Sequence, residues 1–358
     1  MLKAREAVRN LPTYHPPLSG RDGLRLDFNE NTAGCSPRVL ARLREVTAEE
    51  IARYPERGPV EAVVADYFGL EASELLLTNG VDEAIHLLCE TFLEPGDEAI
   101  IVVPTFAMYA ISAAATGARV IAVPTEAEFQ FPLDGVLSQV RSKTRLIAIA
   151  NPNNPTGAVA ANEDLLRIAR EVPQAAILID EAYFEFYGKT LLGQWRNLPN
   201  LFVARTFSKA YGLAGLRIGV LAGDAAHIAM VNRVSSPYNV NGVALACLPT
   251  ALADEEYVRT YVGQVRFGRG LLQQEVGRWG IRCWPSEANF VLASFGPAKG
   301  AFIQGMRERG ILVRDRSADH GCEGCVRITL GTADHTDRLL RALRETLVEI
   351  GAKETTAK

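Results

Sequence analysis

The chain has 358 residues, of which 48% are hydrophobic and 22% charged, and its formal net charge at pH 7 is -4. This composition is typical of a globular protein large enough for two domains, and it excludes the strongly basic surface that binding to nucleic acid or to an anionic membrane requires. The chain opens with no apolar leader and contains no run of about 18 apolar residues. We therefore expect a cytoplasmic protein with small-molecule partners, bound to neither nucleic acid nor membrane.

Short apolar runs alternate with helical patterns in the first part of the chain. The runs are nearly continuous in Val, Ile, Leu and Ala, which is typical of strands covered on both faces. They span residues 75–78, 99–103, 119–123, 145–150, 175–180, 201–205 and 217–221. Between them, residues such as Ile85, Leu88 and Phe92 recur at helical spacing. This order predicts an α/β fold with a mostly parallel central sheet covered by helices.

The pattern changes after residue 237. A long helix is predicted over residues 255–279 and another over 334–350, with strands at 289–293 and 326–330. These elements predict a smaller α+β domain that the N-terminal segment completes. We expect an N-terminal segment over residues 1–45, a large cofactor-binding domain over 46–255 and a small C-terminal domain over 256–358.

Six cysteines are scattered through the chain, and we expect reduced thiols. Cys322 and Cys325 form a CxxC pair close to His320, which leaves a zinc or redox site as an alternative to a reduced pair in a loop. A structural zinc requires further ligands at matching spacing, and the other nearby candidate is His335. We therefore expect no metal.

Polar motifs follow several of the predicted strands, and ligands of open α/β sheets bind beyond the carboxyl ends of the strands. After residues 75–78, Gly80 permits a tight turn into a helix whose first amides attract phosphate, although Asp82 could simply cap that helix. After residues 145–150, two prolines and a glycine rigidify the loop 151–157, whose asparagines can donate to a ring oxygen. Ordinary turn chemistry is the alternative there.

The predicted strand over residues 175–180 ends in Asp180, followed by Tyr183. A carboxylate that ends a buried strand is costly unless a cation compensates it, and a protonated pyridine nitrogen would do so. Tyr183 could donate to the phenolate oxygen of the same ring. The alternative is that Asp180 caps the turn that follows.

Lys209 lies in the run Thr206-Phe207-Ser208-Lys209, and Arg217 follows it. A lysine amine forms a Schiff base with an aldehyde, while hydroxyls and an arginine hold a phosphate. The combination suggests pyridoxal phosphate, and a surface lysine in a Ser/Gly turn is the alternative.

Taken in order, these motifs resemble the fold type I pyridoxal-phosphate enzymes, and within them the histidinol-phosphate aminotransferase branch. The resemblance extends from Tyr14 to Thr332. It is carried by NG with DE at 79–83, NPNNPTG at 151–157, DEAY at 180–183 and TFSKAYGLAGLRIG at 206–219. Supporting runs are LDFNEN at 26–31, RYPE at 53–56, PTFAMY at 104–109, VRD at 313–315 and VRITLGT at 326–332.

The resemblance implies a role for each matching residue. Lys209 would form the Schiff base with the cofactor and, once released, move the proton at the substrate's α-carbon. Asp180 would hold the ring nitrogen, with Asn154 and Tyr183 on the phenolate oxygen, and Phe106 would stack on the ring. The residues that would hold the cofactor phosphate are Gly80, Val81, Asp82, Thr206, Ser208 and Arg217.

The resemblance also implies partners and a substrate. Tyr54 would reach the cofactor phosphate of a neighbouring subunit, which implies a homodimer with shared active sites. Arg314 and Arg327, with Tyr14, would bind the substrate phosphate, and Asn31 would contact the substrate. Arg314 could instead belong to a solvated charge cluster, RDR.

The expected activity is transfer of an amino group from histidinol phosphate to a 2-oxo acid acceptor, 2-oxoglutarate, in histidine biosynthesis. Three alternatives stay open at this point. The first is an aminotransferase for aromatic or varied amino acids, and the second is a threonine-phosphate decarboxylase of the same fold. The third is a ligand-sensing domain without catalysis.

Overall fold

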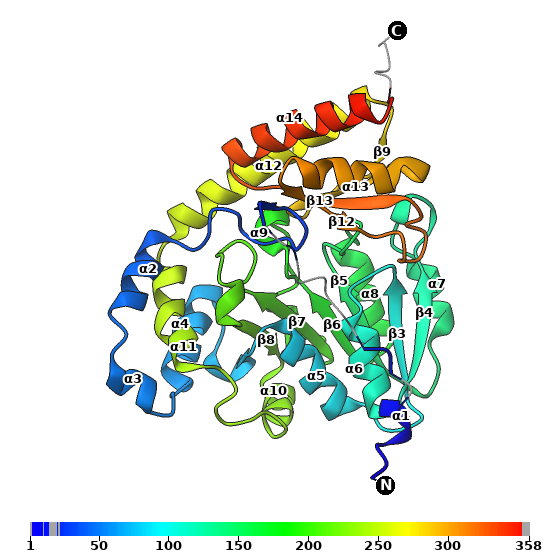
Figure 1. The fold of residues 1–358 in the computed structure, drawn as a ribbon. Helices are drawn as coiled ribbons and strands as arrows, with labels where there is room; N and C mark the ends of the chain where they lie inside the picture. Colours follow the sequence, from blue (N-terminus) through cyan, green and yellow to red (C-terminus); the bar gives the residue numbers. More distant parts are fainter. Residues whose placement is uncertain (1, 10, 14–19, 21, 353–358) are drawn as a thin grey trace.

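A seven-stranded sheet forms the centre of the molecule in the computed structural model, which describes residues 2–9, 11–13, 20 and 22–352 (Figure 1). Its strands lie in the order β2 (Leu75–Thr78), β8 (Gly219–Gly223), β7 (Leu201–Thr206), β6 (Ala176–Asp180), β5 (Thr144–Ala150), β3 (Glu98–Val103) and β4 (Arg119–Pro124). From β7 to β4 all neighbours are parallel, whereas β8 is antiparallel to both β7 and β2. The predicted mostly parallel sheet is confirmed, with β8 as its antiparallel member.

Both faces of this sheet are covered by helices, which explains why its central strands are mostly apolar. On β5, Leu146 and Ala148 pack into one core cluster while Ile147 and Ile149 pack into another, as the alternation of side chains along a strand requires. The first cluster includes residues of α5 (Val81–Phe92), α6 (Met108–Thr116) and α10 (Ala225–Asn232). The second includes residues of α4 (Gly58–Phe68), α7 (Leu133–Gln139), α8 (Asn162–Glu171) and α11 (Gly242–Leu252).

A smaller antiparallel sheet lies above the central one in Figure 1. Its order is β12 (Arg314–Asp315), β13 (Cys325–Thr329), β10 (Phe290–Ser294) and β9 (Arg282–Cys283). The helices that pack with it are α12 (Glu255–Arg278) and α13 (Lys299–Glu308), and α14 (Ala333–Glu349) packs on both of these helices. The bounds of α12 and α14 lie within one residue of the expected ranges. The N-terminal segment joins this layer, because β1 (Leu24–Arg25) pairs in parallel with β11 (Ile311–Leu312).

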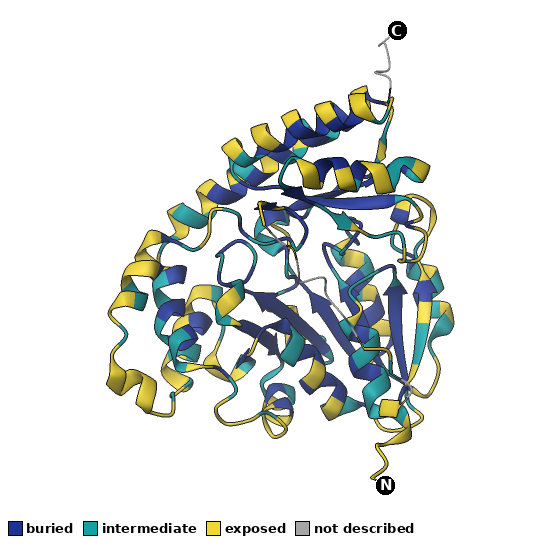
Figure 2. Ribbon diagram, in the orientation of Figure 1, coloured by how far each residue is buried: buried dark blue, intermediate teal, exposed yellow. Residues whose placement is uncertain are grey.

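Of the remaining helices, α1 (Glu6–Arg9), α2 (Pro37–Arg44) and α3 (Ala48–Ala52) lie at the periphery (Figure 1), whereas α9 (Phe184–Tyr187) packs against α12. Figure 2 shows that burial is concentrated in the central strands, whereas the outer faces of the helices are exposed. Within the described ranges, no helix combines the length and apolarity needed to cross a bilayer. The domain boundaries at residues 45 and 255 stay predictions.

Candidate active site

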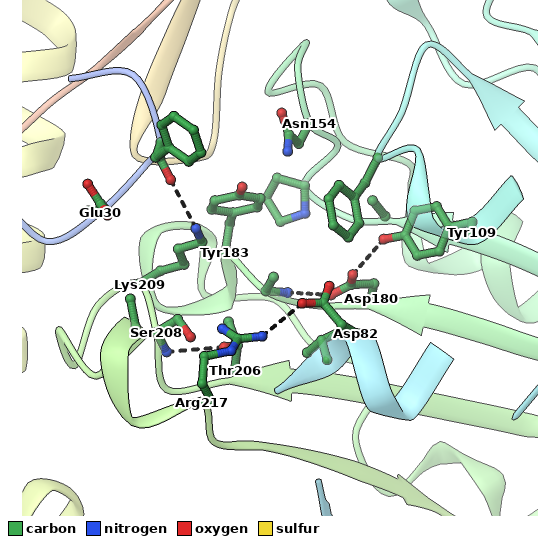
Figure 3. Close-up of a pocket in the computed structure, with 17 residues that line it drawn as sticks. Glu30, Asp82, Tyr109, Asn154, Asp180, Tyr183, Thr206, Ser208, Lys209 and Arg217 are labelled. Carbon is green, nitrogen blue, oxygen red and sulfur yellow. Dashed lines mark hydrogen bonds and ion pairs between the residues drawn. The ribbon is translucent and has the colours of Figure 1, made fainter. Parts of the chain in front are cut away.

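A cavity of about 320 Å³ opens at the carboxyl ends of the central strands, between the two sheets (Figure 3). It brings together the residues that follow β5, β6 and β7 and those that begin α5. Of the residues predicted to bind a cofactor, all but Gly80 and Tyr54 line it: Val81, Asp82, Phe106, Asn154, Asp180, Tyr183, Thr206, Ser208, Lys209 and Arg217. The cavity therefore unites motifs that are separated by more than a hundred residues in the sequence.

Lys209 projects into this cavity from the turn after β7, and its Nζ donates to the backbone oxygen of Phe28 at 3.1 Å (Figure 3). Burial lowers the pKa of Lys209 to about 8, and the neighbouring charge of Arg327 acts in the same direction. An amine with a lowered pKa is more often in its unprotonated, nucleophilic form. The alternative of a surface lysine in a turn does not hold, since Lys209 is directed inward.

Asp180 ends β6 on the floor of the cavity and is only 5% exposed. Its Oδ2 accepts a hydrogen bond of 2.5 Å from the hydroxyl of Tyr109, and its Oδ1 accepts from the backbone N of Ala182 at 3.0 Å. Burial raises the pKa of Asp180 to about 6, although both hydrogen bonds act in the opposite direction. The capping bond to Ala182 is thus present, but it engages one oxygen of a carboxylate that also faces the cavity.

Tyr183 and Asn154 line the cavity from different loops. The hydroxyl of Tyr183 accepts from Nδ2 of Asn29 at 2.9 Å, and burial raises the pKa of Tyr183. Asn154 accepts a hydrogen bond from Arg327 through its Oδ1. The loop is held in place by Asn153, which donates to the backbone oxygen of Pro104 at 2.9 Å. These contacts fix the loop after β5 against both sheets, which an ordinary connection would not require.

The start of α5 and the segment before β8 form a site with the properties of a phosphate cradle. Gly80 is the N-cap of α5, has a φ of 76° and offers no side-chain cap to the first-turn amides. A Cβ at this position would lie 2.7 Å from Nη2 of Arg217, so the glycine keeps the guanidinium close to those amides. Arg217 also donates to Asp82 at 2.8 Å, and the amide of Ser208 donates to Thr206 Oγ1 at 3.1 Å. Asp82 therefore pairs with a cation and does not cap the helix.

A second cavity of about 120 Å³ adjoins the first and shares Phe28, Phe106, Asn154, Tyr183 and Lys209 with it. Its other lining residues are Asp27, Asn29, Arg314, Arg316 and Arg327. The guanidinium of Arg314 lies 5.3 Å from the ring centre of Phe28, and Nη2 of Arg327 donates to the backbone oxygen of Asp27 at 2.7 Å.

Arg314 and Arg327 are direct cross-strand partners in the β12–β13 pair. Like charges directly opposite each other on a sheet are destabilising, so this pair fits a site that receives an anion. Arg314 lines the cavity with its ring contact to Phe28, which argues against the alternative of a wholly solvated charge cluster.

Besides Gly80, two of the predicted site residues that the structure describes line neither cavity. Tyr54 is 77% exposed, and its ring stacks on Tyr238 with centroids 4.4 Å apart. Asn31 lines a neighbouring cavity, where its Nδ2 donates to the backbone oxygen of Ala210 at 2.9 Å. Tyr14 lies outside the described residues.

Tyr109 and Arg316 are among the residues of the site that the sequence analysis did not predict. Tyr109 stands in the quoted run PTFAMY, but its bond to Asp180 joins positions 71 residues apart. Arg316 belongs to the run RDR, and its place two residues after Arg314 was the available signal, because alternate residues of a strand share a face.

Cys322 and Cys325 are free, buried thiols that pack with Phe129 and Trp284. A hydrogen bond between the two sulfurs raises the pKa of Cys322 and lowers that of Cys325. Within the described ranges, neither belongs to a group of three or more side chains suited to a metal ion.

The donor set has a definite chemical character. A buried amine, a buried carboxylate and a cradle of amides, hydroxyls and a guanidinium surround one cavity, and an arginine-lined cavity adjoins it. A phosphorylated pyridine aldehyde fits this set, since the amine matches its aldehyde, the carboxylate its ring nitrogen and the cradle its phosphate.

Known proteins resemble this chain over nearly its whole length. The family profile of aminotransferase class I and II matches residues 21–345. A histidinol-phosphate aminotransferase of Roseobacter denitrificans is 36% identical over 356 residues, covering 96% of this chain and 98% of the relative. Another, from Thermoanaerobacter sp., is 34% identical over 333 residues, covering 90% and 93%. The solved histidinol-phosphate aminotransferase of Sinorhizobium meliloti in complex with pyridoxal-5'-phosphate has a TM-score of 0.89 at 24% identity, covering 98% of this chain and 99% of that one.

Proposed function

This chain belongs to the aminotransferase class I and II family, and on that premise we propose that it transfers the amino group of histidinol phosphate to 2-oxoglutarate. Its architecture is fold type I, its cofactor is pyridoxal 5'-phosphate, and its substrates are a small-molecule amino donor and a 2-oxo acid. The observation that carries the choice of substrate is the arginine-lined cavity beside Lys209, which suits a second phosphate.

When bound, the cofactor supplies a pyridinium ring that draws electrons from the bond broken at the substrate's α-carbon. Lys209 would hold the cofactor's aldehyde carbon through Nζ. When free, the same amine would take and return the proton at the substrate's α-carbon, a role that contributes roughly a hundred- to ten-thousandfold in rate. Its lowered pKa leaves a useful fraction of the amine free to accept that proton.

Asp180 would hold the ring nitrogen in its protonated form, because an ionised carboxylate in a buried site requires a cationic partner. Tyr109 and the amide of Ala182 keep this carboxylate in position. Tyr183 and Asn154 would donate to the phenolate oxygen, and Phe106 would cover one face of the ring.

The cofactor phosphate would be received by the cradle at the start of α5. Its donors would be the backbone amides of the first turn, two hydroxyls and a guanidinium, contributed by Gly80, Val81, Asp82, Thr206, Ser208 and Arg217. A helix N-terminus and an arginine both favour a dianion, which is why a phosphate suits this end of the cavity.

Arg314 and Arg327 would bind the substrate phosphate and, in the other half-reaction, a carboxylate of glutamate. Tyr14 and Asn31 are further candidates for substrate contact.

We propose a homodimer in which Tyr54 of one subunit reaches the cofactor phosphate of the other. The exposure of Tyr54, an aromatic residue stacked on the half-exposed Tyr238, supports a role at a subunit contact.

A substrate panel tests the proposed function. Histidinol phosphate, phenylalanine, aspartate and threonine phosphate are each offered with 2-oxoglutarate, and glutamate formation is scored against carbon dioxide release. We expect glutamate formation with the highest kcat/KM for histidinol phosphate. Carbon dioxide without glutamate would identify a decarboxylase, and a preference for phenylalanine would identify an aromatic aminotransferase. Borohydride reduction should leave a pyridoxyl mass on Lys209, and a Lys209→Ala variant provides the matched control.

A further inference from the structure

A third guanidinium lines the cavity that holds Arg314 and Arg327. Arg316 follows β12, and its side chain is 14% exposed. Its backbone N donates to the oxygen of Cys325 at 3.0 Å, which continues the pairing between β12 and β13 beyond Asp315. Because Arg314 and Arg316 are two residues apart on this extended segment, their side chains leave the same face. All three arginines therefore converge on the same space of about 120 Å³.

Arg316 is held in this position by Asp319. Its Nε lies 2.5 Å from Oδ2 of Asp319, and the backbone N of Asp319 donates to the oxygen of Arg316 at 3.0 Å, closing a turn. A guanidinium carries five N–H donors in a rigid fork, and the ion pair with Asp319 places the carboxylate beside Nε. The donors on the two terminal nitrogens are those that suit a second oxyanion, in the forked arrangement typical of arginine.

The charge balance of the cavity favours a dianion. Three arginines face it, whereas its acidic groups are Asp27 on the wall and Asp319 behind Arg316. Burial raises the pKa of Asp319, and the charges of Arg316, Arg327 and Arg314 act in the opposite direction. A phosphate monoester carries about -1.5 to -2 at pH 7 and a carboxylate -1, so the third cation matters more to the phosphate.

We propose that Arg316 is a specificity-determining residue that makes this subsite prefer a phosphate monoester to a carboxylate or an uncharged group. The proposal rests on the proposed function for the identity of the amino substrate, but the presence of a phosphate subsite can be tested without it. Arg314 and Arg327 then form the general anion site, and Arg316 adds the charge and donors that a dianion requires.

The test compares Arg316→Gln and Arg316→Lys with the wild-type holoenzyme. Arg278→Gln is the matched control, because Arg278 also pairs with a carboxylate three residues away, Glu275, but lies outside the cavity. The half-reaction is followed through cofactor absorbance with histidinol phosphate and with histidinol, giving an apparent Kd and a limiting rate. Calorimetric titration of the holoenzyme with inorganic phosphate provides a readout that is independent of turnover.

For Arg316→Gln we expect the apparent Kd of histidinol phosphate to rise roughly 10- to 100-fold, the range for loss of a hydrogen bond to a charged group. The Kd of inorganic phosphate should rise in parallel, while the limiting rate changes little. Arg316→Lys should recover part of the affinity, because it restores the charge without the fork.

Wild-type affinity of Arg316→Gln for inorganic phosphate would overturn the proposal, as would an equal loss of affinity for histidinol and histidinol phosphate. The proposed function would be refuted, and the phosphate subsite supported, by one combination of results. In that case the wild-type enzyme does not react with histidinol phosphate, but Arg316→Gln binds inorganic phosphate more weakly than the wild type does.

Discussion

The substitution Asp180→Asn tests whether this site is built at the expense of stability. Burial raises the pKa of Asp180 from its ordinary value of 3.8 to about 6. The difference of about two units corresponds to roughly 3 kcal/mol by which the ionised carboxylate destabilises the cofactor-free protein at pH 8. An isosteric asparagine removes this destabilisation. It also weakens the hydrogen bond from Tyr109, and that loss offsets about 1 kcal/mol of the gain in stability. We expect a net stabilisation of roughly 2 kcal/mol at pH 8.

The sign of the pH dependence follows from the raised pKa. Between pH 4 and about 6 the native state retains a proton that the unfolded chain has lost, so wild-type stability falls as the pH rises through this window. The asparagine variant lacks this dependence. Its advantage should therefore be smaller at pH 5 than at pH 8.

Urea unfolding of the cofactor-free proteins at these two pH values measures the effect. Asp66→Asn, at an exposed position of α4, is the control and should not alter stability in a pH-dependent manner. An advantage of Asp180→Asn that is equal at both pH values, or a loss of stability at pH 8, would refute the reasoning. With the cofactor bound, the same variant should lose most of its turnover, because the ring nitrogen loses its anionic partner.

Two further substitutions test the phosphate cradle and a second carboxyl, which has one buried oxygen. Gly80→Ala should weaken cofactor binding about tenfold or more, because its Cβ would lie 2.7 Å from Arg217 at a positive φ. Gly215→Ala, whose Cβ would have open space, should bind the cofactor as the wild type does in the same fluorescence titration. Burial raises the pKa of Glu185 to about 7, and its Oε2 has no hydrogen-bond partner within the described ranges. Glu185→Gln should therefore raise the free energy of unfolding by up to about 3 kcal/mol at pH 8 and by less at pH 5. A difference independent of pH would contradict this.

The sequence predicted the layers of the large sheet well because burial on both faces leaves a strong local signal. The predicted strand over residues 175–180 corresponds to the observed β6, and both end at Asp180. Strand direction carries no such signal. The apolar run that forms β8 does not indicate whether the strand is parallel or antiparallel to its neighbours. Its antiparallel pairing with β7 depends on the short connection through residues 207–218.

Site residues could be predicted where a sequence motif indicates their chemistry. Contacts between residues far apart in the sequence could not be predicted, because they depend on the tertiary structure. Lys209 and Asp180, which the structure brings into one cavity, could be singled out from the sequence because a lysine beside hydroxyls and a strand-end carboxylate suggest a specific ligand. The bond from Tyr109 to Asp180 depends on how α6 packs against α5 and β3, which local patterns do not encode. Similarly, Arg316 joins Arg314 in one cavity because the pairing with β13 continues beyond β12.

The burial that destabilises Asp180 also prepares Lys209. Both groups line the same cavity, and removal of water shifts each towards its neutral form, so that the pKa of the lysine falls from 10.5 to about 8 while that of the aspartate rises. At pH 7 a fall of this size increases the unprotonated fraction of the amine about 300-fold. The ring nitrogen of the cofactor would compensate the buried charge of Asp180, while the surroundings of Lys209 would still exclude water. The energetic cost at one end of the cavity and the reactivity at the other thus have the same physical cause.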